Sequence, residues 1–147
     1  MTTIWLGLVL LGGILLGIQP TLNAGLARHL GHPLSASLVS FGTATVLLLA
    51  LALALRPPVP SLADLRLMPA WLWLGGAMGA AYVTIALMAT PRLGAAPVVA
   101  LVICGQLAAA LVIDSFGLMG LAARPFDWTK LLGAVCLVAG AVLIRWR

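Results

Sequence analysis

The sequence has almost no acidic side chains and few charges of either sign. It contains no glutamate, and its only acidic residues are Asp64, Asp114 and Asp127. Charged residues make up 7% of the 147 residues, whereas a soluble domain carries roughly a quarter. Such a chain cannot cover itself with a water-soluble surface, and its mean hydropathy of +1.20 agrees with this. We therefore expect an integral membrane protein with a single domain, residues 1–147.

The sequence also lacks the residue clusters that metal sites and catalytic centres require. Its two cysteines, Cys104 and Cys136, lie inside apolar runs, which indicates buried side chains rather than metal ligands or a disulfide framework. His29 and His32 flank Gly31 and are predicted to lie at the membrane interface. No nucleophile–base pair or phosphate loop is visible, so we expect neither an enzyme nor a bound metal or cofactor.

Basic residues outnumber acidic ones, and the net charge is +5. In a soluble protein this excess would suggest a nucleic-acid partner, but no basic stripe or stacking platform accompanies it. The basic residues instead mark loops and the ends of apolar runs, where they anchor membrane proteins. We expect the lipid bilayer as a partner and no nucleic acid.

What the sequence has in abundance is apolar residues, in five runs about long enough for the roughly 20 helical residues that cross a hydrocarbon core. The runs are residues 4–27, 34–55, 70–90, 94–113 and 129–144. They show no alternation with a period of two, so helices are favoured over a barrel. The predicted fold is all-α with five transmembrane helices, the fifth anchored by Trp128 and Trp146.

An internal repeat relates the first two predicted spans to the next two, at an offset of 63 residues. The matches that carry most weight are glycines: Gly12/Gly75, Gly13/Gly76, Gly31/Gly94 and Gly42/Gly105. Chance similarity is the alternative, because leucine and valine matches are frequent in this composition. If the repeat is real, two helical hairpins of the same orientation are followed by an unpaired fifth span.

The basic residues are divided equally between the two sides that five spans define. One side carries Arg56, Arg66, Arg124 and Lys130. The other side carries Arg28, Arg92, Arg145 and Arg147. The charge bias that normally fixes orientation is therefore absent. This predicts a chain that inserts both ways and forms an antiparallel homodimer, although an accidental balance is the alternative.

Polar side chains interrupt the apolar spans, most conspicuously in the first. Gln19 and Asn23 are four residues apart and so share one helix face, and Pro20 between them loosens the helix by removing a backbone donor. Other candidates for a polar cavity are Ser40, Thr43, Tyr82 and Gln106. Serine and threonine hydroxyls also bond between helices, which is the simpler interpretation for them. The two glutamines and the asparagine favour a substrate cavity.

No ionisable residue lies near the centre of a predicted span, which argues against proton coupling through a membrane-embedded carboxylate. Asp114 comes at the end of the fourth span, where the helix dipole is unfavourable for it. It is predicted to form a gating or interfacial pair with Arg124 or with a partner's arginine, or to face water.

Small residues supply surfaces on which helices can approach closely. We assign helix packing to Gly13, Gly17, Gly76 and Gly105, and bending to Pro20. Gly13 and Gly17 form a GxxxG pattern, which is weak evidence in a chain with 16 glycines.

Five stretches together carry a resemblance over nearly the whole chain. They are GIQPTLNAGLARHLGHPLSASLVSFGT, WLWLGGAMGAAYV, PRLGAAPVVALVICGQ, IDSFGLMG and LLGAVCLVAGAVLI. In this order they resemble the YdcZ family, which consists of small five-span proteins in the drug/metabolite transporter superfamily. The elements QPxxN, GQ and IDxFG are the most specific, and Ser115 stands where relatives often have histidine.

The resemblance implies a multi-pass protein of the bacterial inner membrane. It further implies an antiparallel pair, formed with itself or with a homologous partner of opposite orientation. The function expected is secondary transport or export of small organic solutes by a homodimer with alternating access. The alternatives are a dual-topology channel for a small solute or ion, and a membrane scaffold subunit that transports nothing.

Overall fold

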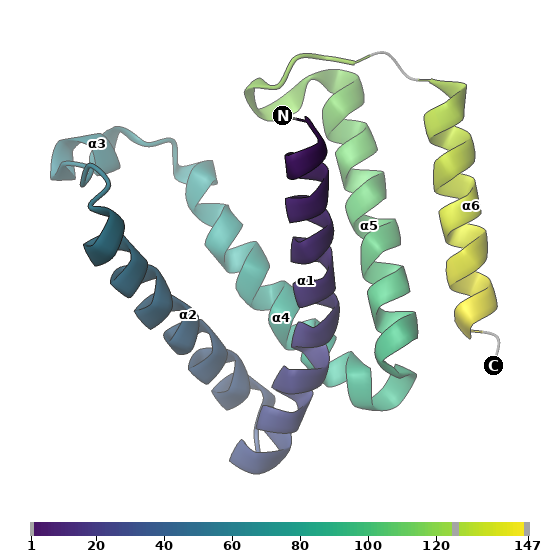
Figure 1. Cartoon of the computed structure of the whole chain (residues 1–147), viewed down its shortest axis with the longest axis horizontal. Helices are drawn as coiled ribbons and strands as arrows, with labels where there is room; N and C mark the ends of the chain where they lie inside the picture. Colours follow the sequence, from purple (N-terminus) through teal and green to yellow (C-terminus); the bar gives the residue numbers. More distant parts are fainter. Residues whose placement is uncertain (1, 125–126, 146–147) are drawn as a thin grey trace. The chain divides into compact units, whose positions relative to one another are not determined.

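The computed structural model describes residues 2–124 and 127–145, and over this range the chain is helical with no strand. The elements are α1 (Thr2–Leu30), α2 (Pro33–Leu55), α3 (Leu62–Leu67), η1 (Ala70–Trp73), α4 (Leu74–Leu93), α5 (Ala95–Phe116), η2 (Leu118–Gly120) and α6 (Trp128–Arg145) (Figure 1). Five of the described helices are long and apolar enough to cross a membrane, with η1 and α4 forming one span. The predicted helical class and the five spans are confirmed. Trp146 and Arg147 lie outside the described residues.

The helices form two compact units, residues 1–92 and residues 93–147, each of which is described by itself. In the first unit α1 packs against α2, and α2 contacts α4 through a small core. In the second unit α5 packs against α6, and η2 folds against α5. The polar patch predicted on the first span therefore belongs to the first unit.

The core of the first unit is small and has one polar link across it. Ala36 of α2 contacts Val83 and Leu87 of α4, and Tyr82 packs against this cluster. The Ser37 and Thr84 hydroxyl oxygens lie 2.9 Å apart, between α2 and α4. Because Thr84 donates its proton to the Ala80 carbonyl, Ser37 donates to Thr84. The predicted role of hydroxyls as links between helices is confirmed for this pair.

Most of the helical surface is apolar and exposed. From Phe41 to the end of α2 every residue is exposed, and Leu53 reaches 78%. Such a surface is stable only against lipid tails or other apolar helices. Because lipid tails are as apolar as leucine, burial alone drives little helix association in a membrane, and a small core suffices.

The predicted repeat agrees with where the helices end. The first and third spans end at Leu30 and at Leu93, which are 63 residues apart. The next residues, Gly31 and Gly94, have φ angles of 76° and 88°. Glycine adopts this backbone conformation at little cost, whereas other L residues are strained there. The sequence leaves residues 91–93 between the third and fourth predicted spans, but α4 continues through Pro91 to Leu93. Gly94 alone therefore separates α4 from α5.

The connection between α2 and the third span contains a short helix, α3, although four prolines lie within residues 56–69. Ser61 caps this helix: its side chain accepts a hydrogen bond from the Asp64 amide, and Asp64 accepts one from the Ser61 amide. Asp64 therefore caps α3 while its side chain stays exposed to solvent. The hydrogen bonds from Ser61 hold the pKa of the Asp64 carboxyl below its ordinary value.

Acid is expected to weaken the α3 cap. A carboxyl whose pKa is lowered by folding stabilises the fold at pH values above its ordinary pKa, and this contribution is lost as pH falls through the lowered pKa. The cap should thus be complete at neutral pH and should fray only below the range where a free aspartate titrates. Carbon NMR titration of the three aspartate carboxyls measures this directly. Ser61→Ala should raise the pKa of Asp64, and an unchanged pKa would contradict the capping assignment.

Candidate functional site

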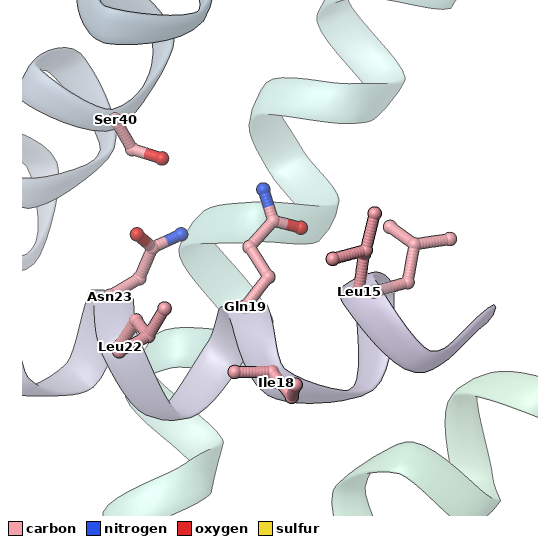
Figure 2. A pocket seen from close by; sticks show the side chains of 7 residues that line it. Leu15, Ile18, Gln19, Leu22, Asn23 and Ser40 are labelled. Atoms are coloured by element: carbon pink, nitrogen blue, oxygen red, sulfur yellow. The ribbon is translucent and has the colours of Figure 1, made fainter. Parts of the chain in front are cut away.

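The first unit contains a pocket between α1 and α2, with a volume of about 430 Å³. This volume falls within the range of small-molecule sites, about 300–1,000 Å³. Its lining residues are Leu15, Leu16, Ile18, Gln19, Leu22, Asn23 and Ser40. Figure 2 shows the polar ends of Gln19, Asn23 and Ser40 in the space between α1 and α2. The structure thus brings three of the predicted cavity residues together.

The pocket lies well inside α1, several turns before its C-terminal end. Gln19 is separated from Leu30, the last residue of α1, by about 16 Å at a rise of 1.5 Å per residue. Half of a hydrocarbon core is about 15 Å thick. If the helix ends at the membrane boundary, Gln19 lies near the midplane and Asn23 about one turn nearer that boundary.

Pro20 adds a backbone acceptor to this region. It is buried, and α1 continues through it without a break in helical structure. Because proline has no N–H group, the carbonyl oxygen of Leu16 lacks the donor that a helix normally supplies four residues later. Leu16 is itself a lining residue of the pocket. The proline thus removes one regular backbone hydrogen bond from the turn of α1 that leads to Gln19.

Asn23 is the most unusual side chain of the site. Only 6% of its surface is exposed, and its amide nitrogen Nδ2 is buried without a hydrogen-bond partner among the described residues. Leaving such a group unpaired costs about 1–3 kcal/mol. Thr43 and Thr90, in contrast, each donate to a carbonyl of their own helix. The cost at Asn23 points to a partner that the folded chain does not itself provide.

The pocket is polar but carries no ionisable side chain among its described lining residues. Two carboxamides and one hydroxyl provide both donors and acceptors, and the rest of the lining is aliphatic. An ion placed here would have no opposite charge to compensate for its lost hydration. The arrangement can therefore hold a neutral molecule by hydrogen bonds and apolar contacts.

Three other predicted cavity residues lie elsewhere. Thr43 is exposed on α2, and its hydroxyl donates to the Val39 carbonyl at 2.9 Å. Tyr82 of α4 packs against the core of the first unit. Gln106 is exposed on α5 in the second unit. None of the three lines the pocket between α1 and α2.

The glycines predicted to pack against helices have open space beside them. A Cβ atom added to any of four glycines would meet no atom within 4 Å; they are Gly13, Gly17, Gly76 and Gly105. Gly79, in contrast, lies close to Phe41, whose ring would be 3.8 Å from an added Cβ. The surface around the four glycines is thus available for contact with another helix.

Asp114 and Arg124 are brought together by their backbones. The Arg124 amide donates to the Asp114 carbonyl at 2.8 Å, and no ion pair joins their side chains within the described part of the chain. Gly117 between them has a φ of 60°, and a Cβ there would lie 2.9 Å from the Ala123 nitrogen. The IDSFG stretch therefore folds the connection back onto the end of α5. The other arrangements predicted for Asp114 remain predictions.

Two features of the first unit were missed in the sequence. One is the aliphatic wall of the pocket, although Leu15 and Leu22 recur at helical spacing with Gln19 and Asn23 and could have been found that way. The other is a second pocket, of about 270 Å³, at the end of the first hairpin. Arg28 and Arg92 both line it, so they lie at the same end of the first unit.

Comparison with known proteins identifies one family. The family described as "Putative inner membrane exporter, YdcZ" matches residues 4–143, which is nearly the whole chain. No curated protein and no solved structure gives a match. With five apolar helices of membrane-spanning length, this match means that the chain belongs to the YdcZ family and is a multi-pass inner membrane protein.

Proposed function

We propose that the protein is a secondary transporter that exports small organic solutes as a homodimer with alternating access. The family supports a membrane transporter in general. The observation that carries the proposal further is the pocket between α1 and α2, where Asn23 keeps a buried amide without a partner. Transporters usually bind their substrates near the midplane, beside a helix whose regular hydrogen bonding is interrupted. Pro20 provides such an interruption beside Gln19 and Asn23.

The proposed dimer is antiparallel. The equal numbers of basic residues on the two sides support it, because neither orientation is favoured during insertion. The structure supports one part of that count, since Arg28 and Arg92 line one pocket. Two copies in opposite orientations would form an inverted repeat, the arrangement from which many alternating-access transporters are built. A homologous partner of opposite orientation would serve the same purpose.

In this dimer we assign a role to the predicted residues that lie outside the pocket between α1 and α2. Gln106 would supply a further amide to the substrate path, and the open surfaces at Gly13 and Gly76 would let helices approach and slide. Asp114 would close the end of α5 by its backbone bond to Arg124. Thr43 would face lipid and is the natural control position.

A C-terminal topology reporter is expected to give signal from both sides of the inner membrane in cells. The physical reason is the equal division of the eight basic residues. Replacing Arg28 and Arg92 by glutamine should then fix one orientation, with the side of Arg56 and Arg66 in the cytoplasm. Signal from one side alone in the unmodified chain would exclude the antiparallel homodimer, and a partner of opposite orientation would have to be sought.

Transport kinetics separate the carrier from its alternatives. Saturable, slow flux through reconstituted protein is expected of a carrier. Ohmic single-channel currents would instead identify a dual-topology channel. A scaffold subunit would move no solute, and changing Gln19 to leucine would then leave the cell phenotype unchanged while Gly13→Leu would still disturb assembly.

A further inference from the structure

We infer that the pocket between α1 and α2 selects neutral amphipathic molecules whose polar head both accepts and donates hydrogen bonds. The inference rests on the proposed transport function and adds the substrate class to it. Two features of the pocket support this substrate class. Some of its polar groups have no hydrogen-bond partner in the folded chain, and its described lining residues carry no charge.

At this pocket the structure shows one donor without a partner, and one acceptor loses its regular helical donor. The donor is Asn23 Nδ2, which is buried and unpartnered. The acceptor is the Leu16 carbonyl, which loses its helical donor to Pro20. A head group that offers both an acceptor and a donor, as a carboxamide or a hydroxyl does, could satisfy both. A hydrocarbon could satisfy neither.

Gln19 and Ser40 extend the same pattern. Neither side chain makes a hydrogen bond to another described residue, and both are only half-buried. Figure 2 shows their polar atoms beside those of Asn23. The terminal torsions of asparagine and glutamine have broad, roughly two-fold preferences, so each amide can turn either its nitrogen or its oxygen towards a ligand. The head group thus meets adaptable partners as well as Asn23.

The rest of the ligand must be apolar. Four of the seven lining residues are leucine or isoleucine: Leu15, Leu16, Ile18 and Leu22. They offer dispersion contacts and no hydrogen bonds from their side chains, so a second polar group on the ligand would be desolvated without compensation. An aliphatic body beside a single polar head fits this lining.

The pocket has no counter-charge for an ion. Arg28, five residues after Asn23 in α1, lines the other pocket of the first unit. Asp64, the only acidic residue of that unit, is held by Ser61 in α3. Carboxylates and ammonium groups should therefore be excluded, because neither would find a compensating charge. Head-group charge becomes the property that separates ligands from non-ligands.

The test uses full-length protein in lipid nanodiscs, labelled with ¹⁵N-asparagine. Asn23 is the only asparagine of the chain, so its side-chain amide gives a single, assigned pair of signals. The probes are hexanamide, hexanoate and pentylammonium, which share one pentyl chain and differ in the charge of the head. Hexanamide is expected to shift the Asn23 signals saturably, and the two ions are expected to leave them in place.

Matched variants locate the effect. Ser40→Phe places a large ring in the pocket and should abolish the hexanamide shift, whereas Thr43→Phe, three residues along α2 and outside the pocket, should preserve it. No shift with hexanamide, equal shifts with all three probes, or a shift that survives Ser40→Phe would each overturn the inference.

The substrate class and the transport function can fail separately. Suppose that reconstituted protein transports a solute, but neither that solute nor hexanamide shifts the Asn23 signals. The inferred substrate class is then wrong, and the proposed transport function stands. If hexanamide shifts the signals saturably but no member of a solute panel is moved, the binding class stands and the proposed transport function is wrong.

Discussion

Replacing Asn23 by leucine is expected to stop most solute transport and at the same time to make the folded protein more stable. The change removes a buried amide whose nitrogen has no partner, so the free energy of unfolding should rise by about 1–3 kcal/mol. It also leaves the polar head of a bound solute unpaired. A penalty of the same size lowers the transport rate at low solute concentration by roughly 5–150-fold. The measurements are uptake by reconstituted protein and unfolding in detergent.

The opposite directions of the two effects distinguish a binding residue from a structural one. A structural asparagine would lose stability and transport together, whereas a functional polar group is held at a cost in stability. Thr43→Val is the matched control, because Thr43 is exposed and its hydroxyl bonds only to its own helix. It should change uptake less than twofold. Full uptake by the Asn23→Leu variant would remove Asn23 from the site.

Changing Gly117 to alanine is expected to destabilise the connection between α5 and α6. Gly117 has a φ of 60°, where a left-handed backbone costs other residues about 1–2 kcal/mol. The added Cβ would also lie 2.9 Å from the Ala123 nitrogen and 3.0 Å from the Ala123 Cβ. Relieving that overlap would disturb the nearby hydrogen bond from Arg124 to Asp114. Together the loss of unfolding free energy should be about 2–5 kcal/mol.

Gly133→Ala provides the control for this effect. Gly133 lies within α6, and a Cβ added there would meet nothing within 4 Å. Because alanine has a higher helix propensity than glycine, this variant should be as stable as the original chain or slightly more stable. Chemical unfolding in detergent, followed by circular dichroism, compares the two. Equal stability of both variants would contradict the observed conformation of the IDSFG connection.

The membrane spans were predictable because their signal is composition over long windows. Helix ends were less so: α1 and α4 each continue three residues past the predicted boundary, because hydropathy falls at Arg28 and Arg92 while the helices end only at glycine. The missed helix α3 carries the pattern Ser-x-x-Asp at its start, which is a sequence signature of a capped helix. The sequence-based prediction placed no helix between residues 55 and 70, a stretch that also contains four prolines.

The site was predictable only where its residues lie on a single helix. Gln19 and Asn23 fall on one face of any helix that contains them, so their proximity needs no tertiary information. The choice between Ser40 and Thr43 does need it. Apart from its serines and threonines, α2 is apolar on every face. The pattern of apolar residues therefore does not indicate how α2 is rotated against α1. Only the packing of α2 shows that Ser40 lines the pocket and that Thr43 does not.

The most direct test of the account is a counterflow measurement with reconstituted protein. Liposomes loaded with an unlabelled neutral solute are diluted into a trace of the same solute carrying a radiolabel, across a panel of small amides and alcohols. An alternating-access carrier predicts a transient accumulation of label above equilibrium for at least one member, absent from empty liposomes and much reduced by Asn23→Leu. Label that only equilibrates, without overshoot at any loading concentration, would contradict a carrier and favour a channel or a protein that transports nothing.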